Sequence, residues 1–240
     1  MTNQFATQAV HAGEERPKPH GALATPIVQT STYTFQDTAD ILDFMHRKEA
    51  GDELQRVDYG RYGNPTQNAV EGKIASLEGG ERALLFASGM SAISTTIGAL
   101  LSAGDHLIMA REVYHRTYDL AVDYLTRWGI ETTFVPIDDL DAMAAAVRPE
   151  TRAIFSETPS NPYLGIMDLP RMVEVARAHN VVTVVDSTFA TPVNLRPLDL
   201  GADLVTHSAT KYLGGHNDLL AGIVVGPRSL LAQIEEARGV

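Results

Sequence analysis

The segment Val181-Val182-Thr183-Val184-Val185-Asp186 decides the fold class of this chain. It places five consecutive residues with high β-propensity directly before a carboxylate. Unbroken apolar strands of this kind are typical of parallel sheets that are covered on both faces, because neither face of such a strand meets water. Similar short apolar runs occur before and after this one, with helical periodicity between them.

From about residue 68 onward, short apolar strands alternate with helical segments. This alternation indicates βαβ units, and therefore an α/β fold with a mostly parallel sheet and helices on both faces. We expect strands at residues 83–86, 107–109, 132–135, 153–155, 181–185, 204–207 and 223–225. We expect helices at residues 69–77, 91–101, 117–128, 140–147, 169–179 and 229–238.

The N-terminal quarter of the chain has a different character. It contains Pro17, Pro19, Pro26 and Pro65, and only the stretch 38–48 has helical character. We therefore predict an extended arm over residues 1–65 and one large domain over residues 66–240. A polar arm with little core of its own gains burial by packing on a neighbouring subunit.

Composition excludes several classes of function. The 240 residues include 44% hydrophobic and 20% charged residues, which is typical of a globular protein. The net charge of −11 argues against binding to nucleic acid or to an anionic membrane surface. The absence of cysteine excludes disulfides, thiolate metal sites and a cysteine nucleophile, and we predict no metal site. No signal peptide or membrane-spanning run is visible, so we expect a cytoplasmic protein.

Ligands of parallel sheets bind beyond the carboxyl ends of the strands, so the residues that follow each strand are the candidates for a site. The first strand leads into Ser88-Gly89-Met90 and then a helix, and a helix N-terminus of this kind suits a phosphate. An ordinary turn with a serine cap is the alternative. No Walker loop is present and no Gly-x-Gly-x-x-Gly motif follows a strand, which argues against a nucleotide site.

A lysine, a carboxylate and an amide follow other strands. Lys211 is one of four lysines and the only one that follows a buried strand into a turn; we expect the other three to be solvated. Burial there would favour the neutral amine, which can act as a nucleophile. Asp186 ends its strand, and Asn161 lies between two prolines. A turn cap, a proline-rich turn and a solvated lysine are the structural alternatives.

These features share one economical explanation. A helix N-terminus binds a phosphate, a carboxylate meets a ring nitrogen, and a lysine binds an aldehyde. Together they are the groups that bind pyridoxal phosphate.

The motifs resemble those of the Cys/Met-metabolism family of fold-type-I pyridoxal-phosphate enzymes, which act in trans-sulfuration. The resemblance extends through nearly the whole chain. It is carried by the segments 10–13, 26–33, 59–66, 77–80, 87–92, 157–162, 186–189 and 208–212. It implies a fold-type-I transferase fold and a homotetramer built as a dimer of dimers. It also implies a C-terminal domain with an arginine for the substrate carboxylate, which is absent from this chain.

The resemblance also implies roles for individual residues. It makes Lys211, Tyr114 and Asp186 the catalytic residues, for cofactor attachment, ring stacking and the pyridinium nitrogen respectively. It places Asn161 at the ring hydroxyl and Thr188 beside Asp186. The phosphate ligands that it implies are Gly89, Met90, Ser208 and Thr210, with Tyr59 and Arg61 reaching the phosphate of a neighbouring subunit.

One departure bears on the reaction. His115-Arg116 follows Tyr114, where methionine γ-lyases usually have a cysteine at the second position. This basic pair resembles cystathionine γ-synthases, which join cysteine to an O-activated homoserine. Arg116 would suit an anionic homoserine ester, or it simply faces solvent. The alternatives are a cystathionine γ- or β-lyase, an O-acylhomoserine sulfhydrylase, or a truncated protein that binds the cofactor without catalysis.

Overall fold

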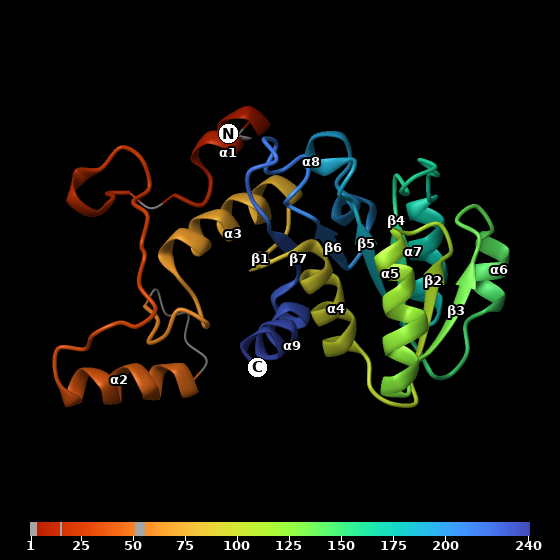
Figure 1. The fold of residues 1–240 in the computed structure, drawn as a ribbon, viewed down its shortest axis with the longest axis horizontal. Helices are drawn as coiled ribbons and strands as arrows, with labels where there is room; N and C mark the ends of the chain where they lie inside the picture. Colours follow the sequence, from red (N-terminus) through yellow and green to blue (C-terminus); the bar gives the residue numbers. More distant parts are fainter. Residues whose placement is uncertain (1–3, 15, 51–55) are drawn as a thin grey trace.

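A seven-stranded sheet forms the centre of the molecule (Figure 1). The computed structural model describes residues 4–14, 16–50 and 56–240, so residues 1–3, 15 and 51–55 of the expected arm lie outside it. The strand order is β1-β7-β6-β5-β4-β2-β3. The strands are β1 (Arg82–Phe86), β2 (His106–Ala110), β3 (Glu131–Val135), β4 (Thr151–Glu157), β5 (Val182–Asp186), β6 (Leu204–His207) and β7 (Gly222–Gly226).

Helices surround this sheet and form the N-terminal region. The helices of the described residues are α1 (Phe5–His11), η1 (Pro19–Gly21), α2 (Thr38–Glu49), α3 (Pro65–Glu78), α4 (Gly89–Leu100), α5 (His115–Asp119), η2 (Leu120–Leu125), η3 (Thr126–Trp128), α6 (Leu140–Ala145), α7 (Leu169–Ala178), α8 (Thr191–Asn194), η4 (Pro197–Leu200) and α9 (Arg228–Gly239).

The pairing of strands confirms the predicted α/β class with a mostly parallel sheet. Strands β2 to β6 are parallel to one another, whereas β7 runs antiparallel to both β1 and β6. All five residues of β2 are buried, as expected of a strand covered on both faces. The chain moves outward from β2 to β3 and then back through β4, β5 and β6, so the direction of winding reverses between the neighbouring strands β2 and β4.

Local sequence signals set several helix ends around the site. The Ser88 side chain caps α4 by accepting the N–H of Ser91 at 3.0 Å. Asn64 caps α3 in the same way through the N–H of Thr66, and Gly79 ends that helix in the left-handed region at φ 75°. The cap at Ser88 agrees with the serine-capped turn that is one interpretation of the segment after the first strand.

The sequence missed helix α1 and predicted one uniform helix at residues 117–128. Helix α1 contains no buried residue, so it has no apolar periodicity to detect. The segment expected at 117–128 begins earlier, and it passes from α5 through the π-helical turn η2 and the 3₁₀ turn η3 before Gly129 ends it at φ 76°.

The expectation that three of the lysines are solvated holds for Lys48, whose side chain is 44% exposed, but is wrong for Lys18, whose side chain is 7% exposed, and for Lys73, which is half-buried. The ammonium of Lys73 donates to the carbonyls of Ala9 and Val10 at 2.9 and 2.8 Å, and so fastens α1 to α3. Lys18 is paired with Glu14, and Lys48 lies 3.7 Å from a carboxylate oxygen of Asp58. Each of these lysines is thus held by the N-terminal region itself.

Candidate active site

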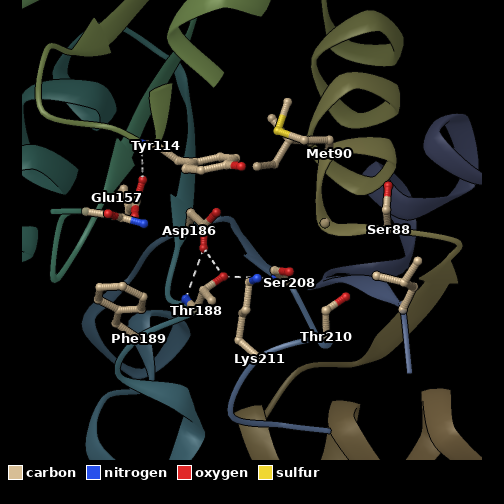
Figure 2. Close-up of a pocket in the computed structure, with 14 residues that line it drawn as sticks. Ser88, Met90, Tyr114, Glu157, Asp186, Thr188, Phe189, Ser208, Thr210 and Lys211 are labelled. Carbon is tan, nitrogen blue, oxygen red and sulfur yellow. Dashed lines mark hydrogen bonds between the residues drawn. The ribbon is translucent and has the colours of Figure 1, made fainter. Parts of the chain in front are cut away.

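A cavity of about 210 Å³ lies beyond the carboxyl ends of the central strands (Figure 2). It contains nine of the eleven residues that the sequence proposed for the cofactor. These nine are Gly89, Met90, Tyr114, Asn161, Asp186, Thr188, Ser208, Thr210 and Lys211. The cavity is also lined by Ser88, Ile93, Glu157, Phe189 and Leu220, to which the sequence had assigned no role.

Asp186 is the buried carboxylate at the floor of this cavity. Its Oδ1 accepts the backbone N–H of Thr188 at 2.9 Å and the hydroxyl of Thr188 at 2.5 Å. Burial raises the pKa of Asp186, and the hydrogen bonds from Thr188 oppose that shift. The second carboxylate oxygen accepts no hydrogen bond from the described residues and points toward the Tyr114 side of the cavity (Figure 2).

Thr188 links this carboxylate to the segment that carries the lysine. Its hydroxyl donates to Asp186 and accepts the backbone N–H of Ser208 at 2.8 Å. One hydroxyl therefore fixes the position of Asp186 relative to the turn that follows β6. Thr188 therefore lies beside Asp186, and its role toward the cofactor stays a prediction.

The first turn of α4 presents unpaired backbone N–H groups at one side of the cavity. The first N–H groups of any helix lack an intrahelical acceptor, and Ser88 satisfies that of Ser91. The N–H groups of Gly89 and Met90 have no acceptor among the described residues. A Cβ atom at Gly89 would lie only 2.7 Å from the Cβ of Ser208, so glycine allows the helix end to approach Ser208.

The turn after β6 contributes Ser208, Thr210 and Lys211. The hydroxyl of Ser208 has no partner among the described residues, whereas that of Thr210 donates to the carbonyl of Ala221 at 3.1 Å. Lys211 lines the cavity with an amine that donates no hydrogen bond within the described part of the chain. Lys211 is exposed to solvent in this single chain, which differs from the burial expected of it.

Glu157 is the site residue that sequence reasoning missed. It ends β4 as Asp186 ends β5, and this shared position after a buried strand is the signal that could have found it. Its Oε2 accepts the backbone N–H of Tyr114 at 2.5 Å. Burial, together with the negative charge of Asp186, raises the pKa of Glu157 to about 8.

Tyr59 and Arg61 are the two proposed residues that this cavity does not contain. Arg61 lines a second cavity, of about 430 Å³, which shares Leu220 with the first. Its guanidinium lies over the rings of Tyr59 and Tyr62, at 5.2 and 5.3 Å from their centroids. Within one chain, therefore, the arm does not complete the cavity.

Arg116 also lies outside the lining of the cavity. Its side chain is 64% exposed and its guanidinium is 3.2 Å from a carboxylate oxygen of Asp119. His115 packs its ring edge-on against Tyr114, at 4.5 Å between centroids. Of the two interpretations of Arg116, binding of an anionic ester or exposure to solvent, the structure of this chain agrees with exposure to solvent.

These residues fit pyridoxal phosphate. The unpaired N–H groups of α4 and the hydroxyl of Ser208 suit its phosphate, the available oxygen of Asp186 suits its ring nitrogen, and the amine of Lys211 suits its aldehyde. The fold and the cavity thus define an α/β enzyme that uses this cofactor.

Comparison with known proteins identifies the family. Residues 6–238 match the family described as Cys/Met metabolism PLP-dependent enzyme, and the chain belongs to it. It is 42% identical over 230 residues to L-methionine gamma-lyase of Pseudomonas putida, covering 96% of this chain and 56% of that protein. It is 43% identical over 225 residues to a probable cystathionine gamma-synthase of Herpetosiphon aurantiacus, covering 94% and 66%.

A solved structure agrees with this family. Cystathionine gamma-lyase from Lactobacillus plantarum, complexed with L-serine, superposes with a TM-score of 0.87 at 39% identity, covering 98% of this chain and 58% of that one. The predicted family, fold-type-I fold, cofactor and enzyme class are thereby confirmed. The chain spans a little over half the length of most of the relatives it matches. Among the described residues, no helix has the length and apolar character needed to cross a membrane.

Proposed function

We propose that the protein is a cystathionine γ-synthase, which replaces the γ-substituent of an O-activated homoserine with the sulfur of cysteine. The observation that carries this choice is the residue after His115. Arg116 stands where the resemblance places a cysteine in methionine γ-lyases, and the chain contains no cysteine at all. The similarity to a probable cystathionine gamma-synthase supports the proposal, although relatives named as lyases are equally similar.

In such a reaction, different residues of the cavity would bind the cofactor, orient its ring and move a proton. Bound pyridoxal phosphate supplies an electron sink for a carbanion at the substrate α-carbon. Asp186 would hold the ring nitrogen, and its charge would keep a proton there because it stabilises the protonated ring. The amine of Lys211 would hold the aldehyde end of the cofactor and would serve as the base for the α-proton of the substrate. Tyr114 would hold the face of the ring, and Asn161 would hold its hydroxyl side.

Product analysis tests the proposed reaction against its alternatives. With an O-acylhomoserine and cysteine, a γ-synthase yields cystathionine and the free acid. A lyase yields an α-keto acid and ammonia without any thiol acceptor, and a sulfhydrylase prefers sulfide to cysteine. Keto acid as the main product in the presence of cysteine would refute the proposal, and no turnover with bound cofactor would favour a non-catalytic protein.

We further propose that residues 1–65 are an arm, that residues 66–240 form the cofactor-binding domain, and that each site is completed by a neighbouring subunit in a cytoplasmic homotetramer. The position of Arg61 outside the first cavity supports this proposal. An arginine fork suits a phosphate, and two-fold symmetry would supply one to each site.

Subunit complementation tests the trans arrangement. Arg61→Ala and Lys211→Ala homo-oligomers should each be nearly inactive. Mixing them creates sites that combine an intact lysine with the partner's intact arginine, so activity returns. If Arg61 acts within its own subunit, every site keeps a defect and no activity returns.

A further inference from the structure

Glu157 occupies a distinctive position in the sheet. It pairs in register with Asp186, so the two carboxyl groups leave neighbouring parallel strands at the same level. It also lies at the place where the winding reverses, because β4 neighbours β2 and the chain runs from these two strands in opposite directions. Crevices at such reversals are where α/β sheets bind their ligands.

The contacts of Glu157 join two loops that are distant in sequence. Its Oε2 accepts the N–H of Tyr114, in the loop after β2, from 43 residues away. The backbone N–H of Asn161, in the loop after β4, also faces this carboxyl group and acts to lower its pKa. Tyr114 and Asn161 both line the cavity, and Figure 2 shows Glu157 beneath the backbone of Tyr114, with the Tyr114 ring extending over Asp186.

We propose that Glu157 is a positioning residue that fastens the Tyr114 loop to the Asn161 loop and thereby sets the ring and the amide on the cofactor. This inference rests on the proposed cofactor site. The side chain is suited to the task because Glu157 is 4% exposed, so water does not compete for the N–H of Tyr114. No other described side chain accepts the N–H of Tyr114.

Burial and, after it, the negative charge of Asp186 raise the pKa of Glu157 and so favour its neutral acid form. Two carboxylates this close disfavour double ionisation, and Asp186 is the one that receives both donor groups of Thr188. The negative charge is needed at Asp186, opposite the ring nitrogen. A neutral amide of the same length should therefore replace Glu157 better than a shorter carboxylate does.

The test measures cofactor affinity and visible circular dichroism of the bound cofactor in the wild-type protein, in five single variants and in one double variant. Glu157→Ala removes the acceptor, Glu157→Asp shortens its reach, and Glu157→Gln keeps both reach and acceptor. Ser156→Ala is the matched control, because Ser156 is fully buried on the same strand and its hydroxyl has no hydrogen-bond partner among the described residues. Tyr114→Ala, alone and combined with Glu157→Ala, completes a double-mutant cycle.

We expect Glu157→Ala and Glu157→Asp to weaken cofactor binding by about tenfold or more and to reduce the dichroism, because small misplacements of binding groups have large effects. Glu157→Gln and Ser156→Ala should stay close to the wild type. The effects of Glu157→Ala and Tyr114→Ala should not add, because one residue acts through the other.

Other outcomes would overturn the inference. Equal cofactor affinities for Glu157→Asp and Ser156→Ala would overturn it, and so would additive effects of Glu157→Ala and Tyr114→Ala in the double-mutant cycle. If Glu157→Ala does not fold, the comparison of Glu157→Asp with Ser156→Ala still tests the inference. A wild-type protein that binds no cofactor at Lys211 would instead refute the cofactor site itself. Because the readout is binding, it does not depend on which trans-sulfuration reaction the protein catalyses.

Discussion

Substituting Gly89 by alanine tests whether the close approach of α4 to Ser208 forms the phosphate site. The new Cβ would lie 2.7 Å from the Cβ, 2.9 Å from the Cα and 3.0 Å from the Oγ of Ser208. On another side, Gly222 already packs its backbone against Ser88 and Gly89: a Cβ at Gly222 would lie 2.0 Å from the carbonyl oxygen of Ser88. The segment therefore has little room to move away.

The expected magnitude follows from this crowding. Overpacking a buried contact costs about 1–3 kcal/mol, and replacing a helical glycine by alanine returns about 0.5–1 kcal/mol. The variant should lose up to about 2.5 kcal/mol of unfolding free energy. Each hydrogen bond from a backbone N–H to the charged phosphate is worth about 1.5–3 kcal/mol, so misplacing the N–H groups should weaken cofactor binding about 10- to 100-fold.

Gly98→Ala is the matched control, because it adds the same methyl group to the same helix. Its Cβ would meet only the Trp128 Cζ3 atom, at an ordinary 3.8 Å, and we expect it to stabilise the protein by about 0.5–1 kcal/mol. Urea unfolding of the cofactor-free protein and absorbance titration with pyridoxal phosphate measure both effects. If Gly89→Ala matches Gly98→Ala in stability and in cofactor affinity, the reasoning about this helix end is wrong.

Three further predictions concern the buried carboxyl groups. Asp186→Asn should keep part of its cofactor affinity but lose about two to three decades in turnover, worth roughly 2–4 kcal/mol, and steady-state activity within a factor of two of wild type would contradict its role. Because the folded-state pKa of Glu157 is raised from 4.5 to about 8, its contribution to stability is present below pH 4.5 and is lost as the pH rises to 8. Urea unfolding of the cofactor-free protein should show that stability declining by up to about 1.4 kcal/mol per pH unit, and a decline of the same slope in Glu157→Gln would disprove the assignment. His207→Ala should cost about 3–5 kcal/mol, because it leaves the fully buried Glu78 without the imidazole 2.5 Å away. Glu235→Ala, which breaks the pair with Arg82 in which both side chains are 33% exposed, should cost about 1 kcal/mol or less in the same assay.

The amino-acid sequence by itself determined the α/β class, most strand positions and the centre of the candidate site. Lys211, Asp186 and Gly89 could be found because each lies at or within a few residues of the carboxyl end of a strand, and the strands are short apolar runs that are visible locally. The parallel arrangement then requires their carboxyl ends to meet at one edge of the sheet. Nine of the eleven proposed residues do line one cavity, in agreement with that reasoning.

Tertiary structure alone decided which distant groups face one another. Three features of the fold produce no periodic pattern in the local sequence. They are the antiparallel insertion of β7 between β1 and β6, the contact of Glu157 with the loop of Tyr114, and the pair formed by Glu78 and His207 across 129 residues. The local sequence predicts that Lys73 is solvated, whereas in the folded chain α1 packs on α3 and Lys73 donates to a backbone carbonyl of α1. The physical reason is that strand propensity and capping act over a few neighbouring residues, whereas burial and pairing of polar groups depend on which segments the complete sheet brings together.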